Sequence, residues 1–153
     1  MAERATEQGA APGAGPVSHA IFRVARLHKA LAGRLLRESG LRPGQELVLM
    51  ALWDGGPQRQ VDLVAAVESD APTMARSIAR LERAGLVRRS PSPTDRRAVI
   101  VEATESSLAL RARVDSAWAE LERSTVRGLS AEQRAGILAG LGLLESTLAE
   151  TDR

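Results

Sequence analysis

Arginine and hydroxyl side chains share one face of the segment DAPTMARSIARLERAG, which spans residues 70–85. At about 100° per residue, a helix through this segment separates a polar arc from an apolar arc. The polar arc contains Thr73, Arg76, Ser77 and Arg80, and the apolar arc contains Met74, Ile78 and Leu81. Guanidinium groups bind phosphate or guanine in bidentate fashion, and hydroxyls bond to phosphates or base edges. This face therefore predicts recognition of DNA, although an ordinary amphipathic surface helix would show a similar division.

The positive charge of the chain is concentrated around this segment. From Ala71 to Arg97 there are seven arginines and two acidic residues, a local charge of +5, whereas the rest of the chain carries a net charge of −3. A basic segment on a mildly acidic body is typical of an anion-binding surface. A solvated helix face can carry the same charge, so the flanking elements have to decide between the two interpretations.

Three helices are expected before this segment. The first is predicted over residues 17–39, where apolar side chains recur at spacings of three and four and Gly40 provides the end. The second falls within residues 41–57, with Pro43 in its first turn and a Gly-Gly-Pro run as its stop. The third, over residues 58–69, carries a stripe formed by Val61, Val64 and Val67, with Leu63 beside it.

The segment 70–85 is itself predicted to be a capped helix followed by a β-hairpin. Asp70 can accept the backbone N–H of Thr73, Pro72 is tolerated in the first turn, and Gly85 closes the helix. Residues 86–90 and 97–103 then alternate with period two, as antiparallel strands do. Pro91 and Pro93 stiffen the connection between these strands.

Two further helices complete the chain. One is expected over residues 104–127, and the next begins at Ser130, which forms a Ser-x-x-Gln capping box with Gln133. The apolar stripe of this last helix consists of Ile137, Leu138, Leu141, Leu144 and Leu148. The predicted fold is therefore mainly α (α+β), in the order α-α-α-α-β-β-α-α. Two short helices followed by a two-stranded hairpin describe a winged helix-turn-helix.

The composition excludes several classes of function. The chain has no cysteine, so disulfides, thiolate metal sites and sensing by thiol oxidation are excluded. Two histidines without clustered carboxylates make a metal site unfavourable, and we expect no cofactor. No serine, histidine and acid occur in a recognisable catalytic order, so an enzyme is not expected. Neither a signal peptide nor an 18-residue apolar run is found, which favours a cytoplasmic protein without a membrane partner.

Three motifs, in order and at the right spacing, resemble the multiple antibiotic resistance regulator (MarR) family of bacterial transcription factors. QVDLVAAVESDAPTMARSIARLERAGLVRR resembles that family's helix-turn-helix, and PSPTDRRAVIVEAT resembles its wing, with an Asp-x-Arg signature at Asp95 and Arg97. GLSAEQRAGILAGLGLLE is similar to its final helix. The likeness covers residues 17–150. The chain departs from the pattern at Pro72, where a serine is frequent, at Arg42, where a capping threonine is usual, and at residues 103–107, which lack a leucine and a glycine.

The resemblance implies a homodimeric regulator, most simply a repressor, whose two winged domains straddle a pseudopalindromic operator in double-stranded DNA. In this family the positions of Thr73, Arg76, Ser77 and Arg80 read the major groove. Arg97, with Arg96 beside it, then reaches the adjacent minor groove, and Asp95 orients that arginine by a charge-assisted bond. The terminal helices also carry more apolar stripe than one small winged domain can cover, which agrees with a dimer.

These expectations divide the chain into four parts. Residues 1–16 are predicted to be a disordered tail, because they are small, polar and rich in glycine and proline. Residues 17–39 form an N-terminal dimerisation helix, residues 40–103 form the DNA-binding domain, and residues 104–150 form the C-terminal dimerisation helices.

Many members of the family release DNA when a small phenolic or other anionic effector enters a cleft beside the first two helices. The candidates for such a site are Phe22, Arg26, His28 and Trp53. Core packing is the more ordinary role for Phe22 and Trp53, and local packing is the more ordinary role for His28. A regulator that senses no ligand stays open as an alternative. So does a winged-helix protein-interaction module without DNA, although the +5 segment argues against it.

Overall fold

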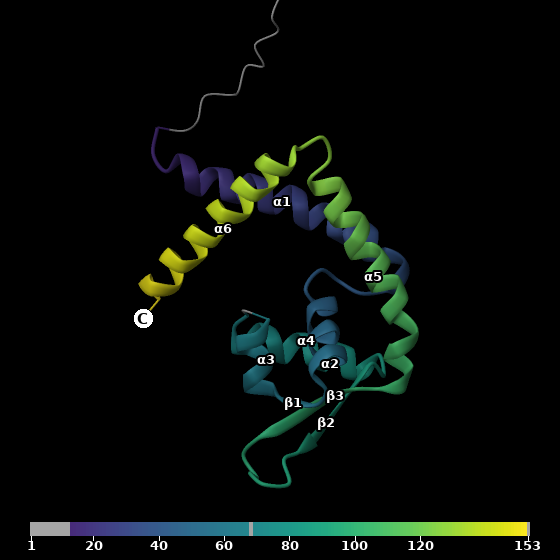
Figure 1. The fold of residues 1–153 in the computed structure, drawn as a ribbon. Coiled ribbons are helices and arrows are strands. Elements are labelled where there is room, and N and C mark those ends of the chain that lie inside the picture. The colour runs from purple at the N-terminus through teal and green to yellow at the C-terminus, as the bar shows by residue number, and fades with distance from the viewer. Residues whose placement is uncertain (1–12, 68, 153) are drawn as a thin grey trace, which may run out of the picture.

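Six α-helices and a three-stranded sheet make up the part of the chain described by the computed structural model, residues 13–67 and 69–152 (Figure 1). The helices are α1 (Pro16–Leu36), α2 (Gln45–Gly55), α3 (Gln60–Ala66), α4 (Ala71–Arg83), α5 (Glu105–Thr125) and α6 (Ala131–Thr151), with a 3₁₀ turn, η1 (Arg37–Ser39), after α1. The strands are β1 (Gln58–Arg59), β2 (Val87–Pro91) and β3 (Val99–Ala103). The predicted winged helix-turn-helix class is confirmed.

The sheet has the order β1-β3-β2 and is antiparallel throughout. Strands β2 and β3 form the predicted hairpin, with Val87 opposite Ala103 and Pro91 opposite Val99. Its tip extends away from the helices at the bottom of Figure 1. The expectation that Gln58 and Arg59 are helical was wrong. They pair with Val101 and Ile100 of β3 instead, because this pairing satisfies backbone groups that a helix start would leave free.

One apolar core holds the winged domain together. Each element that surrounds it contributes fully buried side chains, among them Leu49, Leu63, Ile78, Val101 and Val114. The predicted apolar arc of α4 is confirmed, since Met74, Ile78 and Leu81 are all at most 1% exposed. The predicted apolar stripe around α3 is confirmed in part: Leu63 is fully buried, and Val64 and Val67 pack against the core. Val61 is the exception, because it is 66% exposed. The strand β1 leads directly into α3 and so determines which face of this short helix meets the core.

Local sequence signals determine several helix ends. Asp70 caps α4, Ser130 and Gln133 form the predicted capping box of α6, and Gly40 and Gly85 adopt positive φ after their helices. The placement of Pro43 inside the second helix was wrong, because α2 begins at Gln45. The preceding turn is closed by side chains, with Gly44 N–H donating to Oε2 of Glu46 at 2.8 Å.

The terminal helices differ from the winged domain in burial. Helix α1 packs against α5 and buries Ala32 and Leu36, both in its second half. None of the residues of α6 is buried. Most of the predicted tail, residues 1–12, lies outside the described residues, and α1 begins at Pro16. Among the described residues, no helix combines the length and apolar character that crossing a membrane requires.

Candidate DNA-binding surface

The N-terminus of α4 is held by a chain of hydrogen bonds. Asp70 accepts the backbone N–H of Thr73 through Oδ1 and the hydroxyl of Thr73 through Oδ2, both at 2.8 Å. These bonds lower the pKa of Asp70, so its carboxylate stays charged at neutral pH. The hydroxyl oxygen of Thr73 in turn accepts Nη2 of Arg76 at 3.3 Å. The predicted cap is therefore confirmed, and it also orients the first arginine of the helix.

The outer face of α4 places the predicted polar side chains together. Thr73, Arg76 and Arg80 are exposed, and Ser77 is half-buried at the edge of the apolar arc. Because the opposite face is anchored by Met74, Ile78 and Leu81, the helix cannot rotate without exposing its core contacts. A rigid helix that presents hydroxyl and guanidinium groups outward has the chemistry to contact phosphates and base edges.

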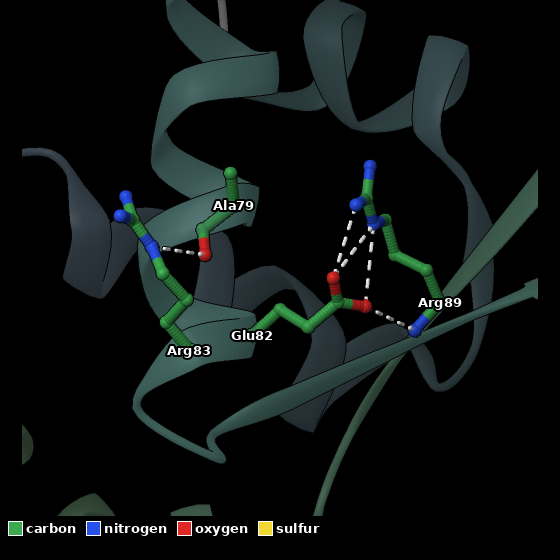
Figure 2. A network of polar contacts seen from close by, with 4 residues as sticks. All are labelled: Ala79, Glu82, Arg83 and Arg89. Atoms are coloured by element: carbon green, nitrogen blue, oxygen red, sulfur yellow. Dashed lines mark hydrogen bonds and ion pairs between the residues drawn. The ribbon is translucent and has the colours of Figure 1, made fainter.

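Two of the seven basic side chains in this region form ion pairs inside the molecule. Arg88 of β2 donates to Glu102 of β3 at 2.7 Å. Arg89 donates through Nε and Nη2 to Glu82 of α4, with a closest distance of 3.0 Å (Figure 2). Among the described residues, the other five lie beyond 4.0 Å from any carboxylate oxygen; they are Arg76, Arg80, Arg83, Arg96 and Arg97.

The tip of the wing is a turn built around Ser92, which is 9% exposed. Its backbone N–H donates to Ala98 O at 3.0 Å, and Ala98 N–H donates to Asp95 O at 3.1 Å. Asp95 Oδ1 accepts the backbone N–H of Arg97 at 3.0 Å. In this structure Asp95 therefore orients the backbone of Arg97, which corrects the expected contact with the guanidinium. The turn brings the amide next to the carboxylate and leaves the side chains of Arg96 and Arg97 exposed.

The four candidates for an effector site do not form one cavity in the single chain. Trp53 is half-buried: its indole N–H donates to Ser107 Oγ at 3.0 Å, and Arg111 lies 5.9 Å from its ring centre. A hollow of about 360 Å³ beside Trp53 is lined by α2, β3 and α5 and by none of the candidates on α1. Arg26 and His28 are exposed, and Phe22 is 77% exposed, so core packing of Phe22 within one chain was wrong.

Sequence reasoning missed the contact between Glu82 and Arg89. It counted all seven arginines as one basic surface, whereas the fold pairs one of them with the only acidic residue of α4. The available signal was an opposite pair of charges seven residues apart on either side of Gly85, a spacing that becomes a contact only when the chain reverses there. The charge pattern alone did not show which arginine would be paired.

The fold and this surface define a winged helix-turn-helix protein with a basic recognition helix and a basic wing. A family model described as the MarR family matches residues 41–99. The repressor NicR of Pseudomonas putida is 34% identical over 122 residues, which cover 80% of this chain and 77% of that protein. The chain therefore belongs to the MarR family of DNA-binding transcriptional regulators, which are not enzymes.

Solved structures agree with this assignment. BpsR of Bordetella bronchiseptica, whose DNA binding is regulated by 6-hydroxynicotinic acid, is 32% identical, with a TM-score of 0.79 over 84% of this chain and 92% of that chain. A mutant MarR from E. coli complexed with operator DNA has the same TM-score at 23% identity, over 84% of this chain and 93% of that chain. The second likeness concerns the fold alone.

Proposed function

We propose that the protein is a homodimeric repressor that binds a pseudopalindromic operator with α4 in the major groove and the wing in the adjacent minor groove. The observation that carries this proposal is the division of the arginines. Of the seven arginines in residues 71–97, the fold uses Arg88 and Arg89 internally. The other five form no ion pair with a described residue, and all of them belong to α4 or the wing tip. Guanidinium groups without ion pairs on two neighbouring elements can enter two adjacent grooves of one duplex.

The exposed apolar side chains of the terminal helices support the proposed dimer. Helix α1 exposes Val17, Phe22, Val24 and Leu27, and α6 exposes Leu138, Leu141, Leu143 and Leu148, each at least 56%. Large apolar side chains exposed in such number on two helices favour an interaction site. A second copy of the chain is the natural partner, because it would present the same helices in return.

We propose a small aromatic anion as effector, with 6-hydroxynicotinic acid as the first compound to examine. This compound regulates DNA binding of BpsR, which shares 32% of its residues with this chain. Arg26 would supply the positive charge for the carboxylate, with Phe22, His28 and Trp53 as the other candidates. Because these residues do not meet in one chain, the proposed cleft requires the dimer.

Selection of bound sequences from random duplex DNA tests the DNA-binding proposal. The expected result is a palindromic motif whose half-sites lie about one helical turn apart. A selection that enriches no sequence, from a protein that is folded and dimeric, would favour a protein-interaction module instead. The effector is then tested by titrating 6-hydroxynicotinic acid into the operator complex, with uncharged nicotinamide as the control.

Release by the acid and not by nicotinamide is expected. Arg26→Ala should weaken that release while leaving affinity for the operator unchanged. A complex that stays intact at all concentrations of the acid would contradict the effector, and an Arg26→Ala protein released as readily as the wild type would remove Arg26 from the site.

A further inference from the structure

We propose that Glu82 is a positioning residue for DNA recognition, which clamps Arg89 and thereby holds the wing at a fixed direction relative to the recognition helix. This inference rests on the proposed function, since it assumes that α4 and the wing contact the same duplex. Glu82 itself points along the surface toward β2, and its role is exerted through the backbone and side chain of Arg89 (Figure 2).

The contact is a fork with a third bond to the backbone. Nε and Nη2 of Arg89 donate to Oε1 of Glu82 at 3.3 and 3.0 Å, and Nε also lies 3.3 Å from Oε2. The backbone N–H of Arg89 donates to Oε2 at 3.3 Å. One carboxylate therefore holds both the side chain and the main chain of a strand residue. The guanidinium of Arg89 lowers the pKa of Glu82, so the clamp is charged at neutral pH.

The contact between Glu82 and Arg89, called the clamp below, lies where it can restrain the hairpin. Strand β2 is an edge strand, bonded on one side to β3, and its other side faces α4. The chain leaves α4 through Gly85 at φ +75°, and Leu86 N–H bonds back to Leu81 O at 2.9 Å. The base of the hairpin is anchored by this turn, by Val87 and Val101 in the core and by the pairing of β1 with β3. The contact between Glu82 and Arg89 adds a polar restraint between α4 and β2 beyond Val87, toward the wing tip.

The same contact determines which arginine is available to DNA. Both side chains of the pair are partly shielded, at 37% exposed for Glu82 and 40% for Arg89, whereas Arg88 is 66% exposed. A guanidinium that already bonds a carboxylate in bidentate fashion has fewer donors left for phosphate. The contact with Glu82 therefore makes Arg89 less available to DNA. It also restrains the direction of the wing, which carries Arg96 and Arg97.

The neighbouring pair of Arg88 and Glu102 provides a matched control. It lies on the same strand and has a short distance of 2.7 Å, but it joins β2 to β3 and leaves the relation of wing to helix unchanged. Arg89→Lys and Arg88→Lys each keep the net charge and remove a guanidinium. They can therefore be compared on the full-length protein, with the selected operator and a scrambled duplex as the two probes.

We expect Arg89→Lys to reduce the ratio of operator to scrambled-duplex affinity by roughly threefold to fivefold, the upper range for a partly exposed ion pair. Arg88→Lys should leave this ratio within twofold of the wild type. Hydroxyl-radical footprints should show weaker minor-groove protection by the wing for Arg89→Lys only. Equal ratios and intact footprints for both variants would overturn the proposal.

A second variant separates positioning from direct DNA contact. Glu82→Gln should release Arg89 to phosphate, so the slope of log affinity against log salt should steepen by about 0.9 on both probes. If Arg89 already contacts DNA in the wild type, the slope will not steepen and the proposal fails. The double variant Glu82→Arg with Arg89→Glu should restore the wing footprint, and its failure to do so while folded would also count against the clamp.

These outcomes are distinct from failure of the proposed function. A wild-type protein that shows no preference for any duplex would refute DNA recognition itself, before any variant is compared. Wild-type recognition together with identical behaviour of the Arg88 and Arg89 variants would refute the clamp alone.

Discussion

The winged domain and the terminal helices use apolar side chains in opposite ways. The winged domain places most of its leucine, isoleucine, valine and methionine side chains in one core, where Leu49, Leu63 and Ile78 have no exposed surface. Helix α6 is as apolar in sequence, yet Leu138 is 72% exposed and none of its residues is buried. The first region forms its core within one chain, whereas the second leaves its apolar side chains exposed. Under the proposed function, substitutions in the winged domain should affect DNA recognition, and substitutions in the terminal helices should affect dimer formation.

The largest effect is expected from a substitution in the exposed apolar surface of the terminal helices. Leu141→Glu places a charge on the exposed stripe of α6 and should convert the dimer into a monomer. Operator affinity should then fall by about 10²–10⁴-fold, because the two half-sites are no longer bound by one particle. Light scattering measures the mass, and gel shifts measure the affinity.

Leu108→Glu is the control for this substitution, since Leu108 is exposed to a similar extent, 53% against 56%, but lies on α5 in the hollow beside Trp53. A Leu141→Glu protein that stays dimeric would show that α6 is not part of the interface.

Two isoleucine substitutions compare the winged domain with the terminal helices through the free energy of unfolding. Ile78→Ala removes a side chain with 0% exposure and should lower the free energy of unfolding by about 2–5 kcal/mol, from lost burial and the cavity left behind. This loss should be the same at all protein concentrations if the core is complete within one chain. Ile137 is 48% exposed, so Ile137→Ala should destabilise chiefly by weakening the dimer.

Denaturant unfolding at several protein concentrations distinguishes the two isoleucine variants. A concentration-independent loss for Ile137→Ala would contradict the idea that its region needs a partner.

Within the winged domain, the recognition helix is expected to carry sequence preference. Arg76→Ala should weaken operator binding by about 1–3 kcal/mol and relax the preference at one base position. Binding to selected variant operators, each changed at one position, measures both effects. An Arg76→Ala protein with the affinity and preference of the wild type would remove Arg76 from the surface.

The wing is expected to act mainly through charge. Arg97→Ala should weaken binding to the operator more than to the scrambled duplex, because the wing meets its groove in a fixed place only when α4 is in register, and should reduce the salt slope by about 0.9 if one phosphate contact is lost. Fluorescence anisotropy over a range of salt concentrations provides the slope. A change in base preference without a change in slope would instead assign Arg97 a base contact.

The smallest effect concerns a buried carboxylate of the winged domain. Glu46 is 3% exposed, and burial raises its pKa above the ordinary value of 4.5, against the opposing effect of nearby backbone amides. The folded state therefore favours the protonated form. This contribution to stability is complete below pH 4.5 and is lost as the pH rises through the raised pKa.

Glu46→Gln should accordingly raise the free energy of unfolding at pH 7 by less than about 1 kcal/mol, because the amide oxygen can still accept the Gly44 N–H. The gain should vanish near pH 4, as measured by urea unfolding at both values. Glu38→Gln, at an exposed position, serves as the control, and an equal gain there would refute the explanation by burial.

Features that depend on a few consecutive residues could be read from the sequence. The cap at Asp70, the capping box at Ser130 and the glycine after α4 involve groups no more than four residues apart, so their side-chain chemistry is local. The two faces of α4 were also predictable, because helical periodicity assigns each side chain to an arc before any tertiary contact exists.

Tertiary structure decided what depends on residues distant in the chain. Only the pairing of Gln58 and Arg59 with β3 makes them a strand, and this pairing in turn leaves Leu63 rather than Val61 in the core. The chain reversal at Gly85 brings Glu82 to Arg89. The sequence thus determined which residues are basic, apolar or capping, because those are properties of single residues and short spacings. The fold alone decides which arginines remain without an ion pair and which apolar stripe remains exposed, because both depend on how residues are placed in space.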